Sequence, residues 1–233
     1  MQKSIGIIGG MGPLATADLF QKIILSTEAS CDNEHIRVFI DCNSSIPDRP
    51  KAILHGGKDP IPEIAKTIEI LANCGADCLI MPCNTAHYYL PQLKLLTAIP
   101  IISILDVTAD ACVEKFPGKR AGLLGTNALI HTGVYGEVLK KDGVDFIIPT
   151  NEIQKLVDEC IYAVKGGKDV FSLRVNMERI ISELKADYYI LGCTELPIIV
   201  ESLNLDIKYI DPTQKLAEAA IKFCGYKIKN QGE

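Results

Sequence analysis

The chain has 233 residues, of which 48% are hydrophobic, and its 24 basic and 29 acidic residues give a net charge of −5. This apolar fraction is ample for one large domain or two small ones, and the acidic balance without a basic cluster argues against nucleic acid as a main partner. The start lacks the apolar region of a signal peptide and no apolar stretch has transmembrane length, so we expect a cytoplasmic protein without a membrane segment.

Strand-like and helix-like segments alternate along the whole chain. Apolar residues at spacings of three and four predict helices such as Pro13–Ala29 and Ile61–Cys74. The apolar runs between helices are typical of strands in a parallel sheet that helices cover on both faces. This alternation predicts an α/β fold with mostly parallel strands. The eight expected strands are Ser4–Gly10, Ile36–Asn43, Cys78–Cys83, Pro100–Asp106, Ala121–Thr126, Val144–Thr150, Tyr188–Cys193 and Asp206–Asp211.

The second half of the chain repeats the first. The segment HGGKDP at His55–Pro60 corresponds to KGGKDV at Lys165–Val170, an offset of 165 − 55 = 110 residues. Cys83 and Cys193 are separated by the same offset, since 193 − 83 = 110. The repeat predicts a duplicated α/β unit with one cysteine at the carboxyl end of a strand in each half.

Ligands of open α/β sheets bind at the carboxyl ends of the strands, so each cysteine is expected at a binding site. If the halves are related by pseudo-two-fold symmetry, both thiols approach one cleft from opposite sides. We therefore predict two similar α/β domains with the active site in the cleft between them. The first domain is expected to comprise residues 1–105 plus 212–233, and the second residues 106–211.

Two thiols facing one carbon centre suit its inversion, which needs a base on one face and an acid on the other. A free cysteine has a pKa near 8.5, and a helix N-terminus lowers it further. Serine would be far too weak a base. Thr85 and Thr194 follow the two cysteines closely and suit the helix cap position. The first helical N–H groups could then point at an anion in the cleft.

Two functions from other classes are alternatives. Gly10, Gly12 and Ala15 spell GxGxxA after a strand, with Asp41 in the next strand, as in nicotinamide-dependent oxidoreductases. That reading leaves the paired cysteines unexplained. The second alternative is a metal or iron–sulfur protein that uses three of the nine cysteines, but their spacing does not converge like a CxxC knuckle, so we expect no metal. Those three are Cys74, Cys78 and Cys83.

Four motifs carry a resemblance to a known family. They are IGIIGGMGP near the start, DCNSSIPDR, MPCNTAH and GCTEL, and they extend from Ile5 to Leu196. Together they resemble the cofactor-independent aspartate/glutamate racemases. Glutamate racemases proper usually carry an aspartate-serine pair near the start and a histidine after the second cysteine motif. This chain has GGMG and Glu195 there, which favours the aspartate branch. Related decarboxylases and isomerases exist, some with one thiol, and keeping both favours racemisation.

The resemblance implies an isomerase that interconverts L- and D-aspartate, with glutamate as a further candidate substrate. It implies that Cys83 and Cys193 are the acid/base pair and that no pyridoxal phosphate or other cofactor takes part. It also implies that Arg49 and Lys165 hold the substrate carboxylates. The residues alone favour an exposed loop charge for Arg49 and a lysine at a helix end for Lys165. The equivalent of Lys165 in the first half is His55, so the fold does not require a lysine there.

Further polar residues adjoin the two cysteines. They are candidates to bind the amino and α-carboxylate groups, and helix capping is the alternative role; they are Asn84, Thr85, Thr194 and Glu195. Thr126 ends the strand equivalent to the first one, and the Met11 backbone lies in the first strand–helix turn, where N–H groups can meet a carboxylate. His87 lies one turn beyond Cys83, either to tune it or as a core histidine. A small amino acid is the only partner that these features predict, and they leave a homodimer open.

Overall fold

The structure is a computed structural model and describes residues 2–229. The chain divides into two compact units. Unit 1 contains the residues up to Ile104 and those from Thr213 onward, and unit 2 is Leu105–Pro212. Each unit has a parallel sheet covered by helices, which confirms the expected α/β class with two parallel sheets.

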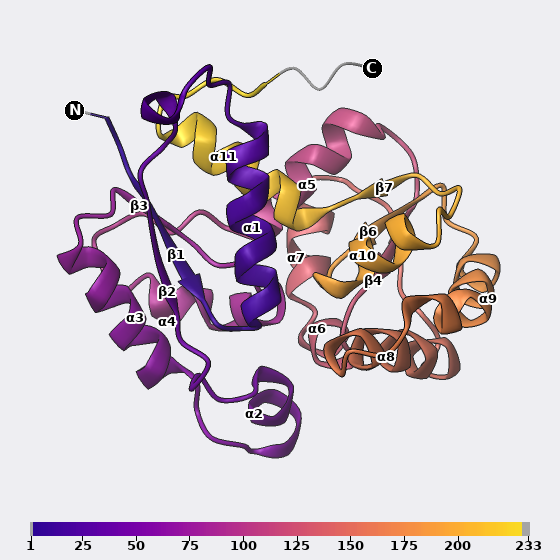
Figure 1. The fold of residues 1–233 in the computed structure, drawn as a ribbon. Helices are drawn as coiled ribbons and strands as arrows, with labels where there is room; N and C mark the ends of the chain where they lie inside the picture. The colour runs from indigo at the N-terminus through magenta and orange to yellow at the C-terminus, as the bar shows by residue number, and fades with distance from the viewer. Residues whose placement is uncertain (1, 230–233) are drawn as a thin grey trace. The chain divides into compact units, whose positions relative to one another are not determined.

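Unit 1 is built on a three-stranded sheet of order β2-β1-β3 (Figure 1). Both pairings of β1 are parallel, and Ile7 lies opposite Ile40 on one side and Ile80 on the other. The strands are β1 (Ile5–Gly9), β2 (Val38–Cys42) and β3 (Cys78–Ile80). The helices are α1 (Pro13–Ser26), α2 (Arg49–His55), α3 (Ile61–Asn73), α4 (Leu90–Leu93) and α11 (Pro212–Phe223), with 3₁₀ helices η1 (Asp32–Glu34) and η2 (Thr85–Tyr89).

Two glycines of β1 let helices approach the sheet from opposite faces. A Cβ at Gly6 would lie 3.3 Å from Leu71 of α3, whereas a Cβ at Gly9 would lie 2.6 Å from Thr16 of α1. Side chains three positions apart on a strand point to opposite faces. It follows that α3 packs on one face of this sheet and α1 on the other.

Unit 2 has a four-stranded sheet of order β5-β4-β6-β7, again with parallel pairings. The strands are β4 (Ala121–Leu124), β5 (Phe146–Ile147), β6 (Tyr188–Leu191) and β7 (Tyr209–Ile210). The helices are α5 (Ile104–Lys115), α6 (Asn127–Thr132), α7 (Val134–Lys141), α8 (Asn151–Lys165), α9 (Arg174–Leu184) and α10 (Glu195–Ser202), with the 3₁₀ helix η3 (Val170–Leu173).

The sequence repeat is visible in matching contacts within the two units. In unit 1, Oδ2 of Asp77 accepts a hydrogen bond from the backbone N–H of Ser4 at 2.7 Å. In unit 2, Oδ2 of Asp187 accepts one from the backbone N–H of Arg120 at 2.8 Å. Each aspartate precedes the strand that carries the cysteine motif and binds the residue that precedes the neighbouring central strand. The repeat therefore extends to individual side-chain roles.

One expected strand, Pro100–Asp106, does not form. Only Ile101 makes a parallel bridge with Leu79, and α5 begins at Ile104. This bridge corresponds to the pairing of β6 with β7 in unit 2, because 189 − 79 = 110 and Tyr189 pairs with Tyr209. The apolar run from Ile101 to Leu105 fits a strand or a buried helix start equally well at this length, which explains the error.

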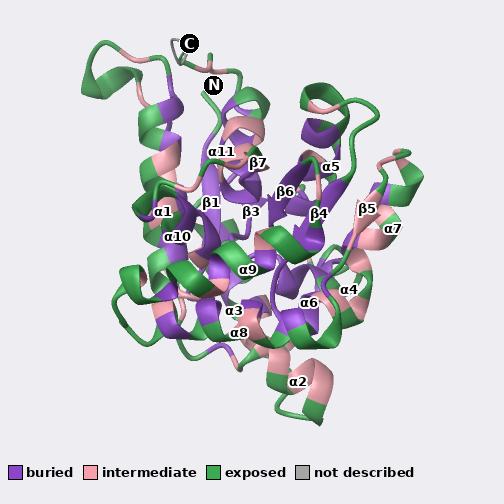
Figure 2. Cartoon of the chain, turned by 90° about the vertical axis from the view of Figure 1, so that its right-hand side faces the viewer, coloured by how far each residue is buried: buried purple, intermediate pink, exposed green. Residues whose placement is uncertain are grey.

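The central strands form the core of each unit (Figure 2). Every residue of β1, β4 and β6 is buried, whereas the edge strands β2 and β5 are partly exposed. Such complete burial is what a parallel sheet covered on both faces requires. Within residues 2–229, no helix has the length and apolar character to cross a membrane.

Candidate active site

Cys83 follows the buried strand β3 and is the candidate catalytic residue of unit 1. Its side chain is 8% exposed, and its N–H donates to the carbonyl of Met81 at 2.8 Å. We call Met11, Arg49, Cys83, Asn84 and Thr85 the Cys83 half-site. Asn84 and Thr85 are also buried, next to the thiol in the chain. An α-helix was expected here, but η2 is a 3₁₀ turn and the Asn84 side chain does not cap it, so helix capping is wrong for this residue.

His87 is a buried core residue that supports the backbone of Cys83. Its Nδ1 lies 2.9 Å from the carbonyl of Cys83, and its Nε2 accepts a hydrogen bond from the N–H of Ile104 at 3.1 Å. These contacts fix the tautomer that carries its proton on Nδ1, because Nδ1 must donate and Nε2 must accept. His87 therefore holds the turn that presents the thiol and uses both ring nitrogens to do so.

Met11 lies in the turn between β1 and α1, and its side chain is 5% exposed. The turn is fixed by Thr16, whose Oγ1 accepts from the N–H of Gly10 at 3.0 Å and donates to the carbonyl of Gly12 at 3.1 Å. Gly10 has a φ of +89°, and a Cβ there would lie 2.2 Å from the carbonyl oxygen of Asn43. The backbone of Gly10, which precedes Met11, thus lies against the residue that follows β2, and only glycine fits at position 10.

Arg49 is the first residue of α2, and it is partly buried rather than an exposed loop charge. Its Nη1 donates to the carbonyls of Ile46 at 3.2 Å and Pro47 at 2.9 Å. Its Nε is buried and has no hydrogen-bond partner within the described part of the chain. A buried guanidinium N–H without a partner is costly, so a ligand carboxylate at Nε would stabilise this arrangement. Helix α2 contacts η2, the 3₁₀ helix that follows Cys83 in the chain.

Cys193 lies two residues before α10 and is the candidate catalytic residue of unit 2. Its Sγ donates to Oε2 of Glu195 at 2.9 Å, and the hydroxyl of Thr194 donates to the same oxygen at 3.2 Å. Thr194 stands at the N-cap of α10, but its side chain makes no capping bond, so the capping role expected for it is wrong. The carboxylate of Glu195 is instead the acceptor for the thiol.

Lys165 ends α8, and its ammonium lies 3.9 Å from Oε1 of Glu195. The lysine side chain is 37% exposed and that of Glu195 only 12%. At this separation the pair is an electrostatic contact and not a hydrogen bond, and solvent weakens it. We call Thr126, Lys165, Cys193, Thr194 and Glu195 the Cys193 half-site.

Thr126 caps α6, since its Oγ1 accepts from the N–H of Leu129 at 3.2 Å. Two side chains of α8, which sequence reasoning missed, hold the residues on either side of it. Nε2 of Gln154 donates to the carbonyl of Gly125 at 2.9 Å, and Oδ1 of Asp158 accepts from the N–H of Asn127 at 2.9 Å. Burial raises the pKa of Asp158, and the bond from Asn127 opposes that rise. Polar residues four apart on one helix face were the available signal.

Burial keeps several of the other seven cysteines in the unreactive thiol form. Desolvation raises the pKa of Cys112 and of Cys160 to about 11, so both remain thiols at neutral pH. A hydrogen bond to Cys224 is the largest cause that raises the pKa of Cys78, and the same bond lowers that of Cys224. The three exposed cysteines are Cys31, Cys42 and Cys74. All nine are free thiols.

The three cysteines of the metal alternative form no metal-binding cluster in the described residues. Cys74 is exposed, Cys78 is fully buried and Cys83 lies beyond the strand, and no group of three or more metal-ligating side chains occurs in residues 2–229. The GxGxxA turn does connect β1 to α1, as a dinucleotide fingerprint requires. This turn alone does not distinguish a nicotinamide-dependent oxidoreductase from a racemase.

A family model described as Asp/Glu/hydantoin racemase matches residues 8–220. The chain belongs to this racemase family. The match covers both cysteine motifs and does not favour the oxidoreductase alternative. The resemblance expected from the motifs is confirmed at the level of the family, and the enzyme class is that of the amino-acid racemases, which are isomerases.

Two known racemases are similar to this chain over nearly its full length, and a third over a shorter part. The structure of Picrophilus torridus aspartate racemase superposes with a TM-score of 0.86 at 33% identity, and the match covers 98% of this chain and 97% of that one. A broad specificity amino-acid racemase, RacX, from Bacillus subtilis (strain 168) is 27% identical over 93% of this chain and 96% of its own length. Glutamate racemase from Aquifex aeolicus is 28% identical over 70% of this chain and 63% of its own.

Proposed function

We propose that this racemase interconverts L- and D-aspartate through two cysteines, Cys83 and Cys193, which act on opposite faces of the α-carbon. The observation that carries the proposal is the bond from the Cys193 thiol to the carboxylate of Glu195 at 2.9 Å. A thiol next to a carboxylate can pass its proton on and take it back, which is what a residue alternating between acid and base needs. Its repeat equivalent, Cys83, is equally buried at 8% exposure.

In the proposed reaction one thiolate removes the α-proton and the other thiol delivers a proton to the opposite face. When Cys193 is the base, Glu195 first accepts the thiol proton, which leaves the thiolate free to take the α-proton. When Cys193 is the acid, its proton goes to the carbon and is replaced from Glu195. Cys83 takes the opposite role: it delivers the proton to the carbon when Cys193 is the base, and it removes the α-proton when Cys193 is the acid. No bond to an organic cofactor is needed, because protons alone move.

The two cationic side chains are proposed to bind the substrate carboxylates. The buried Nε of Arg49 offers an unused donor in a planar fork that suits a carboxylate. Lys165 offers a positive charge beside Glu195. Positive charge near the α-carboxylate stabilises the carbanion that forms when the α-proton leaves. Asn84, Thr85, Thr126, Thr194 and the Met11 backbone are proposed to orient the amino group and the α-carboxylate.

Aspartate is proposed over other amino acids because a similar full-length structure is an aspartate racemase at 33% identity. The similarity to a broad specificity racemase makes a wider substrate range the alternative outcome.

A direct test incubates the purified protein, without added cofactor, with single enantiomers of aspartate, glutamate and alanine. Chiral chromatography then measures the opposite enantiomer. We expect the fastest inversion with aspartate, none in Cys83→Ala, and normal rates in the exposed-thiol control Cys74→Ala. Inversion of alanine as fast as aspartate would replace the substrate assignment, and no inversion of any substrate would refute the proposal.

A further inference from the structure

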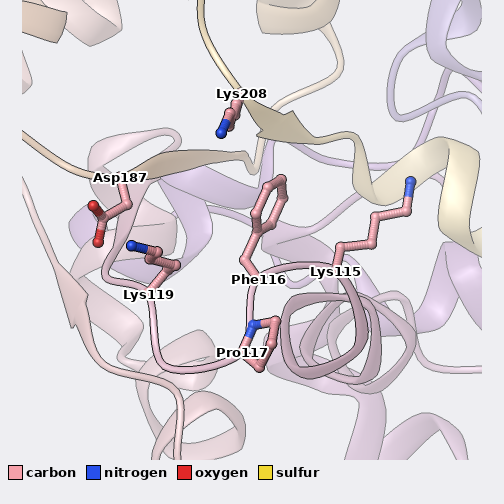
Figure 3. Close-up of a pocket in the computed structure, with 6 residues that line it drawn as sticks. All are labelled: Lys115, Phe116, Pro117, Lys119, Asp187 and Lys208. Carbon is pink, nitrogen blue, oxygen red and sulfur yellow. The ribbon is translucent and has the colours of Figure 1, made fainter.

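A hollow lies in unit 2 (Figure 3). Its volume is about 370 Å³, within the range of sites for small ligands. We call it the lysine pocket; it is lined by Lys115, Phe116, Pro117, Lys119, Asp187 and Lys208. Asp187 directly precedes β6 and Cys193 follows it by 193 − 187 = 6 residues, so about 20 Å of extended chain separates the pocket from the thiol. The pocket is therefore distinct from the Cys193 half-site.

The frame of the lysine pocket is fixed by backbone bonds. The N–H of Lys119 donates to the carbonyl of Phe116 at 3.1 Å, which closes the loop after α5. Asp187 binds Arg120 twice, through its own N–H at 3.0 Å and through its carboxylate at 2.8 Å. The carbonyl of Lys208 accepts from the N–H of Tyr189 at 2.9 Å. Three segments distant in sequence are thus locked around the hollow before any ligand binds, which lowers the cost of binding.

The charge of the lysine pocket is unbalanced. Three lysines line it with one carboxylate, that of Asp187, which already accepts from the backbone of Arg120. Neither Lys119 nor Lys208 has an ion pair within 4.0 Å in the part of the chain that the structure describes. Arg120 lies beside the pocket and is paired with Asp145 at 2.7 Å. In a chain of net charge −5, a hollow with excess positive charge favours an anion.

Phe116 gives the lysine pocket an aromatic wall. Its ring stacks on that of Tyr188 with centroids 4.2 Å apart and planes at 21°. Figure 3 shows the ring between Lys115 on one side and Lys119 and Lys208 on the other. The stack holds the ring in place, and aromatic rings prefer offset-stacked or edge contacts with other rings. A ligand with both a flat ring and an anionic group would use both features of the pocket.

We propose that the lysine pocket binds small aromatic anions of the size of a nucleoside monophosphate. The anionic group would lie between Lys119 and Lys208, and the flat ring would lie against Phe116. The proposal is independent of the racemase mechanism, because none of these residues belongs to either half-site.

Isothermal titration of the full chain with adenosine monophosphate, adenosine, inorganic phosphate and benzoate tests the proposal. We expect the nucleotide to bind at least tenfold more tightly than adenosine or phosphate, with an affinity that falls as salt rises. Binding of benzoate instead of the nucleotide would support the same pocket with a carboxylate as the anion. No binding of either aromatic anion would overturn the proposal.

A pair of charge variants locates the site. The double variant Lys119→Ala with Lys208→Ala should weaken nucleotide binding at least tenfold while aspartate racemisation stays unchanged. The control Lys94→Ala with Lys155→Ala removes the same charge from exposed positions, one just after α4 and one on α8, and should bind within twofold of the wild type. Phe116→Leu should abolish the preference for the nucleotide over phosphate. Equal weakening in both double variants would show a general charge effect and refute the pocket.

Discussion

Replacing Glu195 with glutamine tests the part of the mechanism that depends most closely on the observed geometry. Glu195→Gln keeps the shape and an acceptor oxygen, but removes the charge that can hold the thiol proton of Cys193. The side chain of Glu195 is 12% exposed, so water can replace little of the lost interaction. The substitution should therefore affect proton transfer and leave substrate binding largely intact.

The 2.9 Å bond between the Cys193 thiol and the Glu195 carboxylate sets the magnitude. Hydrogen bonds to charged groups contribute about 1.5 to 3 kcal/mol. If this contribution to the transition state is lost, the rate should fall roughly 10-fold to 150-fold, because about 1.4 kcal/mol corresponds to a factor of ten. Because L- and D-aspartate have equal free energies, kcat/KM must fall by the same factor in both directions. KM should change little, since the lost interaction is with the thiol and not with the substrate.

The assay follows each direction of aspartate racemisation by chiral chromatography. Glu201→Gln, on the exposed side of the same helix, is the matched control and should keep wild-type rates. A Glu195→Gln variant with wild-type kcat would refute the proton-holding role. A raised KM with unchanged kcat would assign Glu195 to substrate binding instead.

Three further predictions concern the first unit. Arg49→Leu should lower kcat/KM for aspartate tenfold to a hundredfold, because a buried charged contact is worth about 1.5 to 3 kcal/mol; unchanged kinetics in the chiral assay would contradict this. His87→Ala should lower the free energy of unfolding by about 2 to 4 kcal/mol in urea titrations, because two buried hydrogen bonds are lost and a cavity forms; exposed His55→Ala should change little. Hydrogen bonds from Ser4 lower the pKa of Asp77, so its stabilisation is present above the unfolded pKa and is lost as pH falls through the folded value. Thermal unfolding of Asp77→Asn should accordingly approach the wild type as pH falls from 6 to 3, and a constant difference would exclude the linkage.

The positions of the two cysteines could be predicted from the sequence because the chain is duplicated. The 110-residue offset located both cysteines at equivalent strand ends, and Asp77 and Asp187 make equivalent bonds in the two sheets. Periodicity also located the helices that cover those sheets. What repeats in the sequence repeats in the fold, since the same buried faces must be covered in each unit.

The features that sequence reasoning missed depend on side-chain direction or on distant segments. The contact of Cys193 with Glu195 requires a particular orientation at the start of α10, which residue type does not reveal. Gln154 reaches the turn before Thr126 from a helix about 30 residues away. The short helix after Cys83 became a 3₁₀ turn because residues 85–89 are too few to specify an α-helix by period alone. The lysine pocket combines three segments that no local pattern links.

The measurement that tests the two-thiol proposal most directly is racemisation of L-aspartate in deuterated water. If one thiolate removes the α-proton and the opposite thiol delivers a deuteron, D-aspartate should carry deuterium from the earliest turnovers while unreacted L-aspartate stays largely protiated. Mass spectrometry of the separated enantiomers gives both values, with Cys83→Ala and Cys193→Ala each expected to abolish net inversion. Deuterium appearing in both enantiomers at equal rates, or full activity in either alanine variant, would contradict a mechanism with one cysteine on each face.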